Sequence, residues 1–385
     1  MSKNIAERVA ALSTAESTDI AAFGRVIDLY VAEGDFAWIG ALGAEIGGVE
    51  DVQWQHEVTL DRILRALADT PTPEALRTLL RVPASLRAKG IKPASAERRL
   101  ATLVAYGHHI EDIEQVVFAE ESESVHSLEF SACLLHELVV IAGGVGQHPA
   151  LHLFHASLVT EGHPLAVLPL DLLSPERGLR KPPQADDNWT WAVPPTPLDA
   201  FAAPDLHATP LMRQRTQDID IIETTTTATG TAMGAAVQHW RDQSNGLIAA
   251  QEFWSPDPVA PEDFAAVFER LPLMSWPEEP PAQLYTSTAE MTLRILFSAA
   301  VRSPAYGPGL YSAYGRLAVW RSLGGLTGAP ADAPLAHIAE LVEQTHWFRV
   351  APTSSWFQQV AWDLSIAALR PGGQEIAVLA ATDTD

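Results

Sequence analysis

The sequence is poor in cysteine and in long hydrophobic runs, and each shortage excludes a class of protein. Cys133 is the single cysteine among 385 residues, so an intrachain disulfide is impossible and no oxidising compartment is required. The longest run of apolar and glycine residues, Leu138 to Gly146, is far shorter than the roughly 20 residues that span a bilayer. The first eight residues carry charges and no apolar signal-peptide core. We therefore expect a soluble cytoplasmic protein that does not enter a membrane.

Lysine is equally scarce, which removes several catalytic and nucleotide-binding motifs. The only lysines are Lys3, Lys89, Lys92 and Lys181. No Gly-x-x-x-x-Gly-Lys phosphate loop is possible with this set, and a Schiff base would need one of these four side chains. The sequence also lacks a Gly-x-Ser-x-Gly elbow, and His136-Glu137 is followed by Val140 where a zincin helix needs histidine. We expect no bound cofactor.

The chain is strongly acidic. It has 25 lysines and arginines against 48 aspartates and glutamates, a formal net charge of −23. A duplex-binding protein usually presents a basic face, because neutralising phosphates supplies most of its affinity. Direct nucleic-acid binding is therefore disfavoured, whereas a basic protein partner is compatible with such a charge.

The pattern along the chain predicts three parts. Residues 1–163 have helical periodicity; in the stretch from Trp54 to Ala68, for example, apolar residues recur every three or four positions. Residues 164–210 are rich in proline and predict an extended connector. Residues 211–385 mix strand and helix patterns. A solenoid of helix pairs is possible for the first part, although no fixed sequence period supports it.

The clearest local signal lies at the carboxyl end. Residues 362–368 alternate apolar with polar or small side chains, residues 370–374 contain Pro-Gly-Gly, and residues 376–380 alternate again, which predicts a β-hairpin. Residues 247–254 and 346–350 are also strand-like, and the threonine-rich stretch 218–228 favours a strand through its β-branched residues. The expected fold is α+β: an all-helical N-terminal portion, then a mixed or antiparallel sheet with packed helices and a C-terminal β-hairpin.

Several short segments carry a family resemblance. They are Leu134-Leu135-His136-Glu137-Leu138, His163-Pro164-Leu165 with Leu168-Pro169-Leu170, the stretch from Trp240 to Phe253, Trp356-Phe357-Gln358-Gln359-Val360-Ala361-Trp362-Asp363, and residues 379–385. Over residues 134–385 the chain resembles an uncharacterised actinobacterial family of the domain-of-unknown-function kind. The resemblance implies a bacterial cytoplasmic protein and no particular activity.

Two local patterns suggest ligand chemistry, and each has a simpler structural interpretation. His148 and His152 stand four residues apart, so they could share one helix face, but zinc would need a third ligand and we predict no metal site. Gly230 and Gly234 lie between a predicted strand and a predicted helix, where backbone amides can bind an anion. Glycines that only relieve a tight turn would give the same spacing.

A second group of candidates surrounds these glycines. His239 and Asp242 are three residues apart and could form an imidazole–carboxylate pair, and Glu252 is an acid flanked by apolar residues that would need an arginine partner or a raised pKa if buried. The remaining candidate ligand-binding residues are Trp240, Asn245, Trp356, Trp362 and Asp363. Each of them also fits an ordinary structural role, as a packed aromatic or a helix cap.

Two functions from different classes follow. The first is a non-catalytic cytoplasmic binding protein, of the immunity or regulatory kind, whose acidic surface engages a protein partner. The alternative is a small-molecule enzyme, a hydrolase or transferase, with a pocket near residues 230–252 and 356–363. A scaffold protein is a third hypothesis, and an exposed apolar patch on the helical half would favour it.

Overall fold

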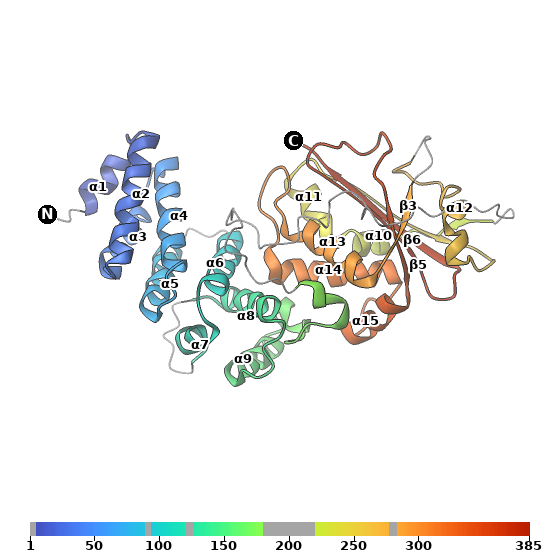
Figure 1. Cartoon of the computed structure of the whole chain (residues 1–385), viewed down its shortest axis with the longest axis horizontal. Coiled ribbons are helices and arrows are strands. Elements are labelled where there is room, and N and C mark those ends of the chain that lie inside the picture. The colour runs from blue at the N-terminus through green and yellow to red at the C-terminus, as the bar shows by residue number, and fades with distance from the viewer. Residues whose placement is uncertain (1–4, 89–93, 120–125, 180–219, 277–282) are drawn as a thin grey trace. The chain divides into compact units, whose positions relative to one another are not determined.

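The computed structural model describes residues 5–88, 94–119, 126–179, 220–276 and 283–385. The chain divides into two compact units, whose helices and strands are labelled in Figure 1: the first comprises Met1–Leu138 with Val145–His163, and the second comprises Val139–Gly144 with Pro164–Asp385. The predicted connector begins at residue 164, where two short 3-10 helices, η2 (Pro164–Val167) and η3 (Ser174–Leu179), belong to the second unit. Residues 180–210 of that connector lie outside the described residues.

The described part of the first unit is helical. Its elements are α1 (Ile5–Leu12), α2 (Ser17–Ala32), α3 (Phe36–Ile46), α4 (Trp54–Ala68), α5 (Pro73–Ala88), α6 (Ala94–Gly107), α7 (Ile110–Ile113), the π-helix η1 (Glu114–Phe118), α8 (Leu128–Ala142) and α9 (Pro149–Thr160). Polar side chains cap the N-termini of two of these helices. Asp35 accepts a hydrogen bond from the Trp38 amide at the start of α3, and Thr72 accepts one from the Ala75 amide at the start of α5, each at 3.2 Å. The predicted helical N-terminal portion is confirmed.

These helices pack as two layers of successive pairs. Helix α4 lies between α2 and α6 in one layer, while α5 lies between α3 and α7 in the other. Fully buried aliphatic side chains fill the space between the layers: Ile27, Ile39, Leu42, Ile63, Leu67, Leu76 and Leu79. Pairs of helices stacked in this way form the elongated surfaces that helical-repeat proteins use for binding. The sequence allowed a solenoid of helix pairs without supporting it, and helices α2 to α7 are stacked in successive pairs of this kind.

The second unit is built on a six-stranded antiparallel sheet, in the order β1-β2-β6-β5-β4-β3. The strands are β1 (Ile222–Glu223), β2 (Leu247–Trp254), β3 (Leu284–Ser287), β4 (His346–Val350), β5 (Trp362–Leu369) and β6 (Glu375–Asp383). The hairpin β5–β6 pairs Trp362 with Asp383 and Leu369 with Ile376. Gly372 and Gly373 form its turn with φ of 92° and 74°, a conformation that favours glycine. The predicted hairpin and the α+β class are confirmed.

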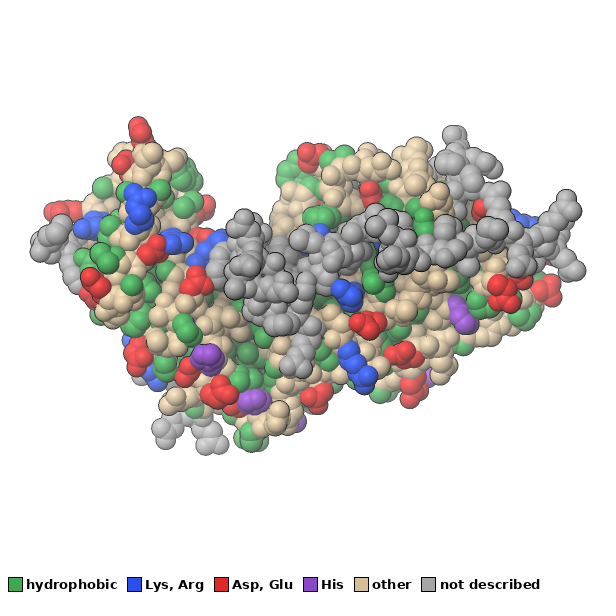
Figure 2. All heavy atoms as spheres, viewed as in Figure 1, with side chains coloured by type: hydrophobic (Ala, Val, Ile, Leu, Met, Phe, Trp, Pro, Cys, Tyr) green, Lys and Arg blue, Asp and Glu red, His purple; other side chains and the backbone are tan. Residues whose placement is uncertain are grey.

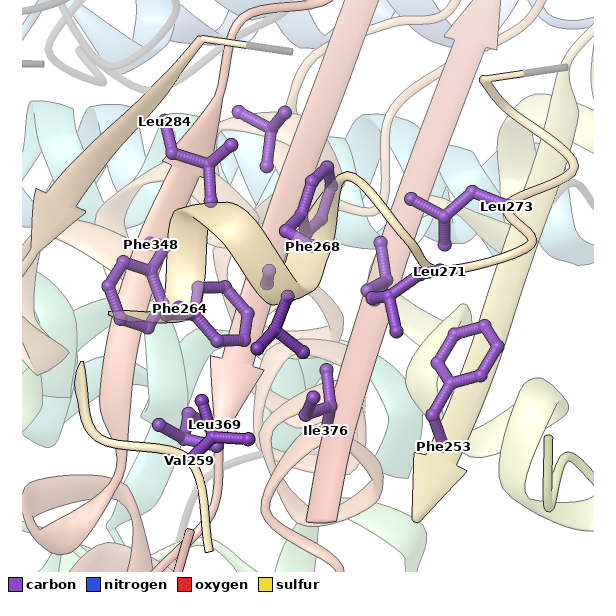
Figure 3. Close-up of a cluster of buried hydrophobic side chains, with 14 residues drawn as sticks. Phe253, Val259, Phe264, Phe268, Leu271, Leu273, Leu284, Phe348, Leu369 and Ile376 are labelled. Carbon is purple, nitrogen blue, oxygen red and sulfur yellow. The ribbon is translucent and has the colours of Figure 1, made fainter. Parts of the chain in front are cut away.

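Each face of the sheet is covered by a different layer. The helices α13 (Ala289–Val301) and α14 (Tyr311–Thr327) lie on one side, and α12 (Phe264–Phe268) lies on the other (Figure 1). Beneath α12, buried apolar side chains of the helix and of the five strands β2 to β6 form a continuous core (Figure 3). Phe264 stacks on Phe348 of β4 with ring centroids 4.2 Å apart. The remaining helices are η5 (Ala235–Val237), α10 (Thr227–Met233), α11 (Gln238–Gln243), η6 (Pro261–Asp263) and α15 (Leu335–Gln344).

The strand predicted for residues 218–228 is mostly wrong. Within its described part, pairing is limited to Ile222 and Glu223 of β1, and α10 begins at Thr227. Thr226 caps this helix, because its hydroxyl accepts the Thr229 amide at 3.1 Å while the Thr229 hydroxyl accepts the Thr226 amide at 3.1 Å. The threonines therefore act through their hydroxyl groups rather than through β-branched packing.

No helix in the described ranges combines the length and the apolar character that crossing a bilayer would demand.

Candidate functional site

Several predicted site residues meet where β6 ends and β5 begins. His239 on α11, Trp362 on β5, Asp383 on β6, and Arg302 directly after α13 form what we call the sheet-end cluster, and Asp363 follows Trp362 on the opposite face of β5. His239 and Asp383 are both buried, as is Arg302. Three segments that are distant in sequence, namely α11, the end of α13 and the β5–β6 hairpin, thus bring an imidazole, a carboxylate, a guanidinium group and an indole ring to one end of the sheet.

His239 is held in its neutral form. Its Nε2 lies 3.4 Å from the Arg302 carbonyl oxygen, and its Nδ1 has no hydrogen-bond partner among the described residues. Burial lowers the pKa of His239 to about 4, although the Arg302 carbonyl and the charges of Asp383 and Asp242 act in the opposite direction. At neutral pH the side chain is an uncharged imidazole with one nitrogen available inside the protein.

Asp383 is a buried acid that the sequence did not single out. Its side chain is fully buried at the end of β6. Its Oδ2 accepts the Ala305 amide at 2.6 Å, whereas its Oδ1 has no hydrogen-bond partner among the described residues. The loop after α13 folds over the strand end and encloses the carboxylate.

Aromatic and polar contacts complete the sheet-end cluster. The Arg302 guanidinium lies 4.8 Å from the centroid of the Trp362 ring, and Trp362 Nε1 donates to the Ser303 carbonyl oxygen at 3.0 Å. Asp363 is half-buried, and burial raises its pKa above the ordinary value, while hydrogen bonds from Thr382 and the Gln359 backbone favour the charged form. Arg302 is the other member of the cluster that sequence reasoning missed, since a single arginine after a helix carries no motif.

The imidazole–carboxylate pair predicted for His239 and Asp242 does not form. Asp242 is exposed on the outer side of α11 and accepts a hydrogen bond from Gln238 Nε2 at 2.7 Å, whereas His239 points into the protein. Trp240 is fully buried, with Nε1 donating to the Ala299 carbonyl oxygen at 3.2 Å. Asn245 Nδ2 donates to the Thr384 carbonyl oxygen at 3.4 Å. The contacts of Trp240 and Asn245 join α11 and the turn after it to α13 and to the residue that follows β6.

Glu252 lies toward the opposite end of the sheet. It is buried and paired with Arg370, as a buried carboxylate between apolar neighbours requires. Arg370 also donates to Glu375 at 2.9 Å and to the carbonyl oxygens of Leu326 at 3.0 Å and Gly325 at 2.9 Å. These bonds engage each nitrogen of the guanidinium group, so the pair connects the β5–β6 hairpin to the end of α14.

Gly230 and Gly234 do not form the amide site that their spacing suggested. Both lie in α10 or at its carboxyl end, and their amides donate to Thr226 and Gly230 carbonyl oxygens at 2.9 and 3.1 Å. The amides are therefore occupied within the helix. Trp356 packs edge-on against Phe357 with centroids 5.0 Å apart, next to a small cluster on the β2–β6 surface. The residues predicted to line one pocket, near 230–252 and 356–363, therefore lie in separate places in the second unit.

The candidate metal ligands have protein partners of their own. His148 Nδ1 lies 2.9 Å from Glu114 Oε2, and His152 Nε2 lies 2.8 Å from the Gly146 carbonyl oxygen. Across the described ranges, no three side chains of histidine, cysteine, aspartate or glutamate are grouped so as to hold a metal ion.

The first unit has a groove between the parallel helices α2 and α4. Gln55 at the start of α4 donates to the Ala15 carbonyl oxygen at 3.3 Å, and farther along Arg62 donates through Nε to Asp28 Oδ1 at 2.9 Å. The groove encloses about 440 Å³ and is lined by Ser17, Ile20, Ala21, Gly24, Arg25, Ile27, Asp28, Trp54, Val58, Thr59 and Arg62. A volume of this size is typical of ligand-binding clefts.

Two large apolar side chains of this groove are half-exposed. Trp54 retains 49% and Val58 retains 47% of their accessible surface. The sequence pattern had grouped them with Ile63 and Leu67, which are fully buried on the same helix. Nine residues separate Trp54 from Ile63, which is two and a half turns, so the two pairs lie on opposite faces of α4. One pair fills the core and the other faces the groove.

Comparison with known families matches residues 21–385 to a family of unknown function, DUF6183. The chain belongs to DUF6183. The predicted membership of a domain-of-unknown-function family is confirmed, and the match begins inside α2, well before residue 134. It therefore covers the sheet-end cluster and most of the α2/α4 groove of this DUF6183 member. No curated protein and no solved structure matches the chain.

Proposed function

We propose that this DUF6183 member is a non-catalytic binding protein of the cytoplasm, of the immunity or regulatory kind, that holds a protein partner on its helical unit. The observation that carries the proposal is the half-exposed Trp54 in the groove between α2 and α4. Tryptophan is enriched among the residues that dominate interface energies, because its large ring loses much water-exposed surface on binding. The layered helix pairs offer the kind of surface on which such partners dock.

The charge of the chain favours a basic partner. The net charge is −23, and on the face drawn in Figure 2 the acidic side chains are spread among hydrophobic ones instead of gathering in one patch. Such a diffuse field accelerates encounter with a cationic protein but does not select a binding mode. A local apolar contact must supply the specificity, and the α2/α4 groove offers one. A cytoplasmic location agrees with the single, buried, free cysteine.

The enzyme alternative has weaker support. Its candidate residues are distributed between the sheet-end cluster, the Glu252–Arg370 pair and α10, and several of them have structural partners. A catalytic site needs its groups to converge on one position that a substrate can reach.

The proposal is tested by partner capture followed by measured affinity. The full chain is immobilised, a lysate of the natural host is passed over it, and the retained protein is purified and titrated calorimetrically against three forms of the chain. We expect a basic partner whose affinity falls about 30-fold or more in Trp54→Ala, a typical loss for an interface tryptophan. Trp254→Ala, which removes a 37% exposed tryptophan of β2, is the matched control and should bind normally. A partner that binds Trp54→Ala as tightly as the unchanged chain would overturn the proposal, as would a chain that retains no partner.

A further inference from the structure

The α2/α4 groove is electrically polarised along its length. The helices are parallel, so their first turns lie together at the end that carries Trp54. Exposed acids surround this end, from the turns before both helices and from their first turns: Glu16, Asp19, Glu50, Asp51 and Glu57. Residues 26–61 contain no lysine or arginine. Two helix N-termini contribute only about half a positive charge each, so the five carboxylates leave the Trp54 end negative.

The opposite end of the groove carries an exposed cationic side chain. Arg25 is exposed there, and Arg62 forms an ion pair with Asp28. Asp69 also interacts electrostatically with Arg62, so carboxylates offset the charge of Arg62, and Arg25 is the exposed guanidinium group of the groove lining. The distance from Trp54 to Arg62 is eight residues of helix, or about 12 Å at 1.5 Å per residue. Carboxylates around Trp54 and the exposed guanidinium group of Arg25 at the other end favour one orientation of a segment that carries charges of both signs.

The middle of the groove is apolar. Val58 is half-exposed on α4, and on α2 the glycine at position 24 presents no side chain, so an apolar group could approach the backbone of the helix. A Cβ built at Gly24 would make an ordinary contact with the aliphatic Cγ of Arg62 at 3.9 Å and meet no other atom within 4 Å, so the position has room for an apolar group. An occupant therefore needs apolar side chains between its two charged ends.

Trp54 is suited to a cationic group. A lysine or arginine head above an indole face is attracted by the negative potential of the ring, at distances up to about 6 Å from its centroid. The surrounding carboxylates add to this attraction, and they would repel an acidic or phosphorylated group at the same position. The chemistry at this end thus selects a basic side chain.

We infer that the α2/α4 groove binds a short amphipathic helix of a protein partner, with a lysine or arginine over Trp54, apolar side chains against Val58 and Gly24, and an acidic side chain near Arg25. The inference rests on the proposed function and adds the type of segment and its direction. A helix of two to three turns spans the 12 Å and presents apolar residues three and four positions apart, as helices bound in grooves do.

The probe is a displayed library of random 12-residue peptides, selected on the full chain after depletion on the Trp54→Ala variant. We expect enriched peptides with lysine or arginine near one end, apolar residues at helical spacing, and aspartate or glutamate near the other end. The best peptide, labelled with fluorescein, is then measured by fluorescence anisotropy at low and high salt. Enriched peptides without a basic residue, or no enrichment, would overturn the inference.

Charge variants complete the test. The double variant Asp51→Asn with Glu57→Gln removes two of the acids around Trp54 and should lower the affinity for the labelled peptide about tenfold at low salt. The loss should be smaller at high salt, because salt screens charge pairs at an exposed surface. Glu45→Gln with Glu111→Gln removes the same charge from exposed positions on α3 and α7, in the other layer, and should change affinity less than twofold. Equal effects of the two double variants would contradict the inference. A protein partner that depends on Trp54, together with peptides that show no charge preference, would refute the inference and leave the proposed function standing.

Discussion

Arg316 of α14 and Glu176 of η3 form a fully buried ion pair between residues 140 positions apart in the chain. The Arg316 Nε and Nη2 atoms donate to the two Glu176 carboxylate oxygens at 2.5 and 2.8 Å. Arg316 Nη1 donates to the Pro169 carbonyl oxygen at 2.9 Å, and Nη2 also donates to the Asp171 carbonyl oxygen at 3.1 Å. Trp320 Nε1 and the Leu173 amide donate to the Glu176 carboxylate at 2.9 and 2.8 Å. Such complete hydrogen bonding is what makes a buried charge pair tolerable.

Removing one partner of this pair should destabilise the second unit strongly. We expect Glu176→Ala to lower the free energy of unfolding by about 3–5 kcal/mol, because Arg316 would remain buried without a counter-charge. Urea unfolding followed by tryptophan fluorescence measures this, since nine of the eleven tryptophans follow residue 188. Glu340→Ala, which removes an exposed partner of His337, is the control and should cost less than about 1 kcal/mol. A Glu176→Ala variant as stable as this control would contradict the prediction.

The pattern of the sequence was sufficient for the elements whose shape is set locally. The β5–β6 hairpin follows from alternation on both sides of Pro371-Gly372-Gly373, and β2 and β4 have the predicted bounds. The threonines before Gly230 were misread, because β-branching and helix capping are both properties of threonine. Which one operates depends on whether the hydroxyl finds a backbone amide, as that of Thr226 does.

Burial of single charged residues was harder to predict, because it depends on partners far away in the chain. Asp383 is enclosed by a loop near Ala305, and Glu252 is paired with an arginine 118 residues later. Trp54 shows the reverse case. Its spacing fits a buried stripe, and only the packing of α2 beside α4 leaves it facing a groove.

The buried His239 should make the second unit sensitive to acid. Its folded-state pKa of about 4 is below the ordinary value of 6.5, so between these two values the unfolded chain binds a proton that the folded chain does not. This contribution to stability is complete above pH 6.5 and is lost as the pH falls to 4, by about 3 kcal/mol. We expect the stability difference between the unchanged chain and His239→Gln to shift by that amount between pH 7 and pH 4, measured by urea unfolding. Parallel pH curves for the two proteins would show that His239 is protonated equally in both states.

The backbones of α4 and α6 approach closely at Gly107, so any side chain at this position should destabilise the first unit. A Cβ at this position would lie 2.0 Å from the Ala68 carbonyl oxygen, and a backbone atom cannot move aside as a flexible side chain can. We expect Gly107→Ala to destabilise the first unit by about 1–3 kcal/mol and to increase hydrogen–deuterium exchange in α4 and α6. Gly24→Ala is the control, because its Cβ has room and alanine favours a helix interior by about 0.5–1 kcal/mol. Since α4 carries Trp54, a Gly107→Ala chain that keeps its exchange protection would mean that α4 and α6 are not packed as closely as the structure has them.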